Sequence, residues 1–208
     1  MALSSAMLAR MMGVDLAPET AIRALWMIWC LSWMAAAVWS DRSVKRPGTR
    51  HQLLYRAFVA IGAVLLFGIR RRPVAGELTL WHASDPVAWL MAALTLVGFL
   101  FTWWARIHLG RLWSSNVARK ADHRLVDTGP YGVVRHPIYT GITVASIATA
   151  GLRGTVAAWL GVGLMTLGWY VKARLEEGFL RDQLGAEQYA SYARRVPMLV
   201  PFTRAFRS

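Results

Sequence analysis

Two short polar stretches hold the side chains that are best suited to chemistry. In the first, Arg135 and His136 directly precede Pro137, and proline is favoured in the first turn of a helix. Both side chains are therefore expected at a helix N-terminus, where the helix dipole favours an anionic group. Tyr139 follows His136 by three residues, on the same helical face. A simpler interpretation, in which these residues only anchor a helix at lipid headgroups, remains open at this point.

The second stretch carries two adjacent carboxylates, Glu176 and Glu177, at the end of a long apolar segment. Lys172 precedes Glu176 by four residues, so a surface ion pair worth under about 1 kcal/mol is one explanation. Two carboxylates at the mouth of a transmembrane helix are costly near lipid, however, and such a placement indicates a site. Tyr189 and Tyr192 follow at helical spacing.

The elements that must position these side chains are apolar and free of charge. The chain has 208 residues, of which 56% are hydrophobic and 17% charged, with a net charge of +13. The uncharged segments are 24–40, 57–69, 86–105, 136–152 and 154–171. Since a membrane span needs about 20 mostly apolar residues, the pattern predicts an all-α integral membrane protein with about five transmembrane helices. The last two segments are separated by Arg153 between glycines and predict an antiparallel hairpin with a very tight turn.

The basic residues predict the orientation of these helices in the membrane. Seventeen of the 24 Lys and Arg residues lie in the stretches 41–50, 106–135 and 172–208, and six lie on the other side. By the positive-inside rule the C-terminus is cytoplasmic, in what we expect to be a bacterial inner membrane. The run Arg70–Arg72 lies on the other side and argues against this orientation, but the larger number of basic residues on the cytoplasmic side favours it. Because headgroups and topology account for most of the charge, nucleic acid is not expected as a partner.

The ordered combination of motifs resembles a known family. Residues 129–141 read Gly-Pro-Tyr-x-x-x-Arg-His-Pro-x-Tyr-x-Gly; the Glu pair, two spaced tyrosines and Arg-Val-Pro follow. Together they resemble the isoprenylcysteine carboxyl methyltransferase family and its bacterial relatives. The matching residues run from about Leu125 to Phe202. We therefore expect one membrane domain over 1–208, with an N-terminal three-helix part (1–110) and a catalytic part (111–208).

The resemblance implies an enzyme that uses S-adenosylmethionine, releases S-adenosylhomocysteine and methylates a lipophilic acceptor in the bilayer, with a cytoplasmic C-terminal region binding the cofactor. The residues implied in catalysis are Arg135, which would face the acceptor, Glu176 and Arg174. Those implied in cofactor binding are Leu125, Val126, Gly129, Tyr131, His136, Pro137, Tyr139, Glu177, Tyr189 and Arg195, with Tyr192 helping to close the pocket. No metal site is expected, because the five histidines are scattered. The oligomeric state is left open.

The chemical class of the acceptor also stays open. The prenylcysteine enzymes carry an arginine where this chain has Lys172, with Arg174 offset by two, and lysine cannot make a planar two-pronged contact with a carboxylate. A phospholipid amine or a small thiol is therefore an alternative to a carboxylate. Outside the methyltransferases, NADPH-dependent sterol-type reductases carry a similar Arg-His-Pro element, although residues 138 and 140 are not the Asn and Phe found there. A non-catalytic membrane partner protein is a third possibility.

Overall fold

A computed structural model describes residues 17–36, 49–68, 78–110 and 125–203. The helices are α2 (Pro18–Ala36), α3 (Thr49–Phe67), α4 (Asp85–Leu109), α5 (Pro130–Val133), α6 (Pro137–Arg153), α7 (Val156–Leu184) and α8 (Ala186–Arg195). Each of the five long helices α2, α3, α4, α6 and α7 overlaps one of the five uncharged segments. The all-helical architecture expected from the sequence is therefore confirmed for this part of the chain.

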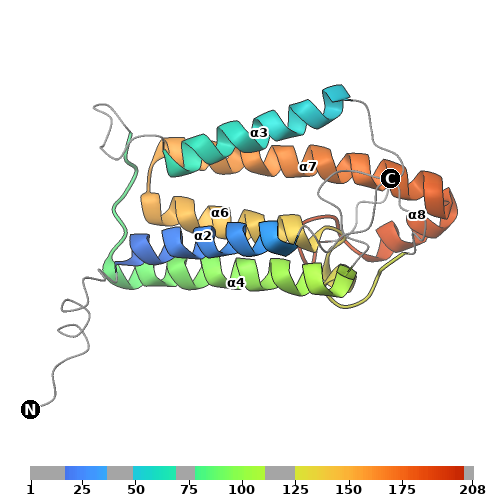
Figure 1. Cartoon of the computed structure of the whole chain (residues 1–208), viewed down its shortest axis with the longest axis horizontal. Coiled ribbons are helices and arrows are strands. Elements are labelled where there is room, and N and C mark those ends of the chain that lie inside the picture. Colours follow the sequence, from blue (N-terminus) through green and yellow to red (C-terminus); the bar gives the residue numbers. More distant parts are fainter. Residues whose placement is uncertain (1–16, 37–48, 69–77, 111–124, 204–208) are drawn as a thin grey trace, which may run out of the picture.

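The long helices run side by side in two groups, one of α3 and α7 and one in which α4 packs along both α2 and α6 (Figure 1). Each group contains a contact between two glycines. A Cβ atom on Gly62 would lie 2.6 Å from the carbonyl oxygen of Gly161, and one on Gly98 would lie 2.6 Å from that of Gly141. Small residues let helix backbones approach this closely, and α3–α7 and α4–α6 are the helix pairs with the most extensive contact.

A tight turn joins α6 to α7 at the end of the bundle away from α8 (Figure 1). Gly154 ends α6 in the left-handed conformation, with φ of 61°, and Thr155 caps α7 by accepting a hydrogen bond from the backbone N–H of Ala158. Arg153 donates to the carbonyl of Phe67 and so fixes the end of α3 to the same turn. The predicted antiparallel hairpin is present. Its two arms, α6 and α7, meet at this turn, which Arg153 attaches to the end of α3.

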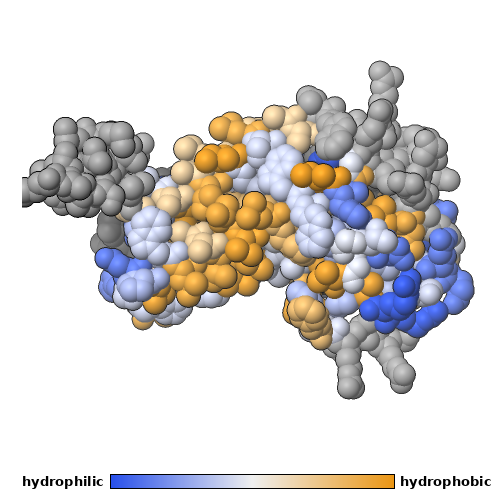
Figure 2. All heavy atoms as spheres, turned by 90° about the horizontal axis from the view of Figure 1, so that it is seen from below, coloured by the Kyte–Doolittle hydropathy of each residue, from blue (hydrophilic) through white to orange (hydrophobic). Residues whose placement is uncertain are grey.

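Apolar side chains cover much of the outer surface of the bundle. Figure 2 shows this hydrophobic body over the helices and a hydrophilic end on the side where α8 lies. In the part of the chain that the structure describes, two helices are long and apolar enough to cross a membrane, Asp85–Leu109 and Val156–Gln183, and only 33% and 39% of their most apolar stretches are buried. A soluble core helix would be mostly buried. The exposed apolar faces give the chain its membrane character.

Trp26 and Trp29 of α2 pack inward. Trp26 contacts the rings of Phe67 and Phe99 edge-on, at 5.1 and 4.8 Å between centroids, and donates to Thr149. Trp29 stacks on Phe99 at 5.2 Å. These contacts connect α2 to α3, α4 and α6, so the first helix belongs to the same core.

Much of the charge that predicts the orientation lies outside the described residues. This holds for Arg70–Arg72 and for the basic residues in 41–48, 111–124 and 204–208. The orientation and the division of the chain near residue 110 therefore stay predictions.

Candidate active site

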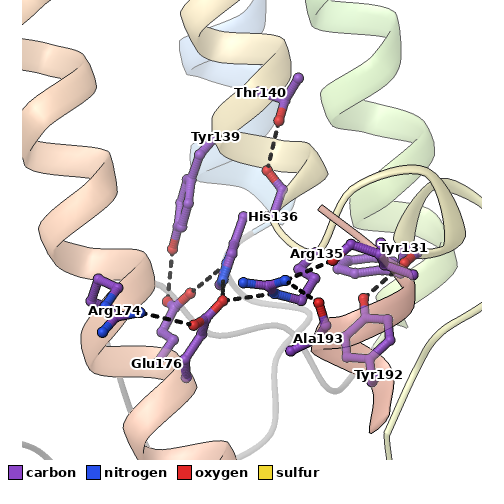
Figure 3. Close-up of polar contacts among 11 residues, drawn as sticks. Tyr131, Arg135, His136, Tyr139, Thr140, Arg174, Glu176, Tyr192 and Ala193 are labelled. Atoms are coloured by element: carbon purple, nitrogen blue, oxygen red, sulfur yellow. Dashed lines mark hydrogen bonds and ion pairs between the residues drawn. The ribbon is translucent and has the colours of Figure 1, made fainter. Parts of the chain in front are cut away.

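The polar residues gather where the N-terminus of α6 meets the second half of α7 and α8 (Figure 3). His136 is the N-cap of α6 and Pro137 is its first residue, as the sequence predicts. The segment after α8 holds this turn by its backbone: the N–H of Arg135 donates to the carbonyl of Pro197 at 2.8 Å, and that of His136 to Met198 at 3.1 Å. The Arg-Val-Pro segment thereby fixes the Arg-His-Pro turn.

His136 lies between the two carboxylates. Its Nε2 is 3.3 Å from Oε1 of Glu177, and its Nδ1 is 3.5 Å from Oε2 of Glu176. Burial disfavours the charged imidazole and lowers its pKa, but the hydrogen bonds and charges of Glu176 and Glu177 outweigh burial and raise the pKa of His136 above its usual value. An imidazolium can donate from both nitrogens at once, so the protonated form fits both contacts.

Glu177 is the centre of a buried ionic network. Its side chain is 2% exposed, and its Oε1 accepts from Nε of Arg135 at 2.9 Å. The same guanidinium donates through Nη1 to the carbonyls of Ala193 and Val196, at 3.1 and 2.6 Å. Arg135 therefore ties α7 to the end of α8. Its Nε and Nη1 contact this chain's own acceptors, and the expectation that Arg135 faces the methyl acceptor stays a prediction.

Glu176 faces a column of parallel rings. The hydroxyl of Tyr139 donates to its Oε1 at 2.7 Å. The Tyr139 ring stacks on His136 at 5.5 Å on one side and on Trp169 at 5.3 Å on the other, with interplanar angles of 9° and 8°. Lys172 Nζ lies 4.0 Å from the same carboxylate oxygen. With 24% of its side chain exposed, Glu176 is the more accessible of the two carboxylates.

The short helix α5 and the loop before it pack against α8. Tyr192 is buried and donates to the backbone carbonyl of Tyr131 at 2.8 Å. Burial raises the pKa of Tyr192, which keeps the hydroxyl protonated for this bond. Leu125 packs on the cluster formed by Tyr189, Tyr192 and Val196. Tyr131 and Leu125 are thereby held beside the ionic network through α8.

On its other side the loop packs against the end of α4. Gly129 has a φ of 57°, and a Cβ atom there would lie 2.8 Å from the ring of His108. His108 also forms a 2.9 Å hydrogen bond with Thr128. Glycine is therefore required at residue 129 both by its conformation and by the space available.

The structure thus brings together most of the residues selected from the sequence. Arg135, His136, Tyr139, Glu176 and Glu177 form one connected cluster. Tyr189 is fully buried beside it, where burial and then the charge of Glu177 raise its pKa.

Other residues selected from the sequence lie at the edge of this cluster. Arg174, 54% exposed, is 3.9 Å from Glu177, and Arg195, 63% exposed, pairs with Asp127 at 3.2 Å. Val126 is half-buried in the loop before α5.

The sequence places Lys172 at the position of the family's arginine, but it does not single out Trp169 or Tyr55 as site residues. Lys172 lies within 6.0 Å of the ring centroids of both aromatic residues. Residues 169, 172 and 176 recur at helical spacing, so one face of α7 could have been identified from the sequence. Tyr55 comes from α3, and nothing in the sequence links it to the distant motifs. Within the described ranges no group of three His, Cys, Asp or Glu side chains gathers as metal ligands would.

Comparisons with known proteins agree with these motifs. The model of the isoprenylcysteine carboxyl methyltransferase (ICMT) family matches residues 90–181, from within α4 to within α7. The nickel-cobalt-cadmium resistance protein NccN of Alcaligenes xylosoxydans xylosoxydans is 30% identical over 164 residues, covering 77% of this chain and 69% of the relative.

Two further relatives are named as methyltransferases. Methanethiol S-methyltransferase 1 of Bradyrhizobium diazoefficiens is 29% identical over 80% of this chain and 59% of the relative. Protein-S-isoprenylcysteine O-methyltransferase B of Arabidopsis thaliana is 31% identical over 41% and 44%.

The fold also resembles a solved structure. The eukaryotic intramembrane Ras methyltransferase ICMT superimposes on 93% of this chain and 71% of its own, with a TM-score of 0.55 and 17% identity. The matched segment runs through the hairpin α6–α7 and includes the Arg-His-Pro turn and both carboxylates. The chain therefore belongs to the isoprenylcysteine carboxyl methyltransferase family, and it is a methyltransferase.

Proposed function

We propose that this protein is an integral membrane methyltransferase that transfers a methyl group from S-adenosylmethionine to a lipophilic or membrane-associated acceptor. The observation that carries the proposal is the buried network of Arg135, His136, Glu176 and Glu177 at the polar end of an apolar helical bundle. Membership of the methyltransferase family sets aside the sterol-type reductase and the non-catalytic partner protein.

We propose that all five long helices span the bilayer. The shorter helices α2, α3 and α6 have 19, 19 and 17 residues. At 1.5 Å per residue they cover about 25–29 Å, close to the roughly 30 Å thickness of the hydrocarbon core. The network end would then face the cytoplasm, in a bacterial inner membrane, with the catalytic part in 111–208.

The charges of the site fit the cofactor. S-adenosylmethionine supplies an activated methyl group on a sulfonium, and it also carries an ammonium and a carboxylate. Glu176 is accessible and Glu177 lies next to it, and carboxylates are suitable partners for an ammonium. We assign the ammonium to this carboxylate pair, with Glu176 as the direct contact.

The remaining residues would enclose the cofactor or position the side chains that contact it. Tyr139 and His136 hold Glu176 from one side, and Arg135 acts as a positioning residue for Glu177. The half-exposed guanidinium of Arg174 lies at the mouth, where it can reach an incoming anion. The other enclosing residues would be Leu125, Val126, Gly129, Tyr131, Pro137, Tyr189 and Arg195.

A small-thiol S-methyltransferase is a second candidate on the same scaffold. The relative named methanethiol S-methyltransferase 1 aligns with 80% of this chain, much more than the 41% aligned with the plant O-methyltransferase. The cofactor site would be the same in both cases, and only the acceptor would differ. A phospholipid amine remains the third acceptor class.

Titration calorimetry on detergent-purified protein tests the cofactor. We expect S-adenosylhomocysteine to bind and NADPH not to bind. Glu176→Gln should weaken S-adenosylhomocysteine binding about 10- to 100-fold, because a charge-assisted hydrogen bond becomes a neutral one. Glu187→Gln on α8, whose side chain is 88% exposed, is the matched control and should bind as the wild type does. A folded wild-type protein that fails to bind S-adenosylhomocysteine would refute the proposal.

A further inference from the structure

The segment that follows α8 is attached to the start of α6 through the carbonyls of four successive residues, 196–199. Arg135 donates to the first two carbonyls, through Nη1 at 2.6 Å and through its backbone N–H at 2.8 Å. The backbone N–H of His136 donates to the third at 3.1 Å, and Oγ1 of Thr140 donates to the fourth at 2.6 Å. The position of this segment is therefore fixed to the turn that carries two residues of the candidate site.

The chain forms a tight, apolar turn directly after this segment. Oγ1 of Thr203 donates to the carbonyl of Val200 at 2.7 Å and closes the turn. Phe202 has a φ of 62°, and among the described residues it is the one non-glycine residue with a positive φ. Such a conformation is unfavourable for a residue with a Cβ atom. Phe202 is nevertheless 98% exposed and Val200 60% exposed, so no contact within the chain accounts for the strained turn.

The hydrogen bonds place this apolar tip, defined as Val200–Phe202, near one end of a proposed membrane span. Thr140, which binds the carbonyl of Leu199, lies in the first turn of α6. Since an extended residue covers at most about 3.6 Å, Phe202 lies within about 11 Å of Leu199. The start of α6 is where the hydrocarbon core would meet the headgroups, a region in which apolar side chains of peripheral segments are buried. Lipid can therefore cover the tip.

The charges beside the tip favour lipid over a second copy of the chain as its partner. The sequence continues with Arg204 and Arg207, and no acidic residue follows the tip. Basic residues beside an apolar segment are attracted to the anionic headgroups of the cytoplasmic leaflet. In a symmetric dimer formed through the tip, the same basic residues of both copies would meet, and their like charges would oppose the contact.

We propose that the tip inserts into the cytoplasmic leaflet as an interfacial anchor, and that its insertion holds the Arg-His-Pro turn in the position needed for cofactor binding. This proposal rests on the placement in the membrane proposed above. Insertion removes two apolar side chains from water. The four bonded carbonyls of residues 196–199 then connect the inserted tip to Arg135 and His136. The lipid contact and the candidate site thus share one segment.

Fluorescence quenching tests the insertion. The whole chain is placed in nanodiscs of phosphatidylcholine and phosphatidylglycerol, after its single cysteine is removed by Cys30→Ser. Thr203→Cys then carries an environment-sensitive fluorophore beside an intact tip. Glu187→Cys on α8, where 88% of the native side chain is exposed, carries the control fluorophore. We expect nitroxide-labelled lipid to quench the fluorophore at residue 203, and aqueous iodide to quench the one at residue 187.

A double variant, Val200→Ser with Phe202→Ser, tests the coupling to the site. The fluorophore at residue 203 should become accessible to iodide, and the backbone amides of Arg135 and His136 should exchange hydrogen faster. S-adenosylhomocysteine should bind about 3- to 10-fold more weakly in nanodiscs, because binding must then order the turn. Leucine at both positions of the tip should retain all three properties, since it is apolar.

Leu78→Ser is the matched control for the loss of an exposed apolar side chain. Leu78 is 70% exposed, and its carbonyl accepts from the backbone N–H of Val156, at the end of the bundle away from α8. This variant should change neither the amide exchange of the Arg-His-Pro turn nor the affinity for S-adenosylhomocysteine.

Quenching of residue 203 by iodide in the chain with an intact tip would overturn the anchor. A fluorophore shielded from both quenchers, in nanodiscs that hold two copies of the chain, would identify a second copy as the partner and would also overturn it. Unchanged amide exchange together with unchanged S-adenosylhomocysteine affinity in the double variant would overturn the coupling. If the double variant does not fold, quenching in the chain with an intact tip decides the outcome. Failure of the wild type to bind S-adenosylhomocysteine would refute the proposed function, whereas quenching and amide exchange would still decide the anchor.

Discussion

Arg135 and Glu177 form a buried ion pair, with Nε 2.9 Å from Oε1, that joins the start of α6 to α7. Because the same guanidinium also binds two carbonyls at the end of α8, one side chain connects three helices. The candidate active site is therefore assembled by an interaction that also contributes to the stability of the fold.

The first prediction concerns Arg135→Met. It should lower the free energy of unfolding by about 3–5 kcal/mol, because it leaves the buried charge of Glu177 without its main partner. Arg135→Lys should be less damaging, since it keeps the charge but loses the forked contacts. Denaturant unfolding followed by circular dichroism in detergent measures both. Arg194→Met, at an exposed pair on α8, is the control and should change stability by under about 1 kcal/mol. Equal effects of Arg135→Met and Arg194→Met would contradict this role.

The second prediction is a pH dependence caused by His136, which precedes α6 and lies outside the segments proposed to span the membrane. Its pKa is raised in the folded protein, so the folded state binds more protons than the unfolded state between the two pKa values. The stabilisation is complete below the unfolded value of about 6.5 and is lost as pH rises through the folded value. The melting temperature should fall over this range, and His136→Asn should reduce the slope. A slope that is unchanged in the variant would exclude His136 as its cause.

The third prediction concerns Tyr192→Phe, which removes only the hydroxyl that donates to the carbonyl of Tyr131. It should lower stability by about 1–3 kcal/mol, because a buried carbonyl loses its partner. It should also weaken S-adenosylhomocysteine binding, since Tyr131 is one of the residues proposed to enclose the cofactor. Tyr170→Phe serves as the control for loss of a hydroxyl at an exposed position. Calorimetry that shows unchanged binding by Tyr192→Phe would separate this loop from the cofactor.

The fourth prediction tests the close contact of α4 and α6. Gly98→Ala would place a Cβ atom 2.6 Å from the carbonyl of Gly141 and should destabilise the protein by about 1–3 kcal/mol. Gly163→Ala is the matched control, because no atom lies within 4 Å of a Cβ built there. It should be neutral or stabilise by up to about 1 kcal/mol through helix propensity. Thermal unfolding of both variants gives the comparison, and equal melting temperatures would argue against the packing.

Local signals in the sequence account for much of this architecture. These signals are the uncharged segments, the glycines around Arg153 and the proline at residue 137, and each depends only on neighbouring residues or on periodicity. The structure has helices at the segments, a turn at the glycines and a helix start at Pro137. The pairing of His136 with Glu176 and Glu177 was predictable only through the resemblance to a family, because 40 residues separate these motifs along the chain.

Long-range packing accounts for the remainder. The contacts of Arg135 with the carbonyls of Ala193 and Val196 depend on where α8 ends in space. The sequence around Arg135 contains no information on that position. Tyr55 joins the site only because α3 packs along α7 through Gly62 and Gly161. Lys172 is surrounded by rings from three helices, a property of the assembled bundle and not of any one helix.

The left-handed turn at Gly154 also sets how far along the bundle the candidate site residues of α6 and α7 lie. Both arms of the hairpin begin at this turn, so the hydrogen bond between Tyr139 and Glu176 depends on the number of residues in each arm. Deleting one residue from α6 would move its far end by about 1.5 Å and rotate it by about 100°. Insertions and deletions in these arms should therefore be much less tolerated than substitutions, even at positions that touch only lipid.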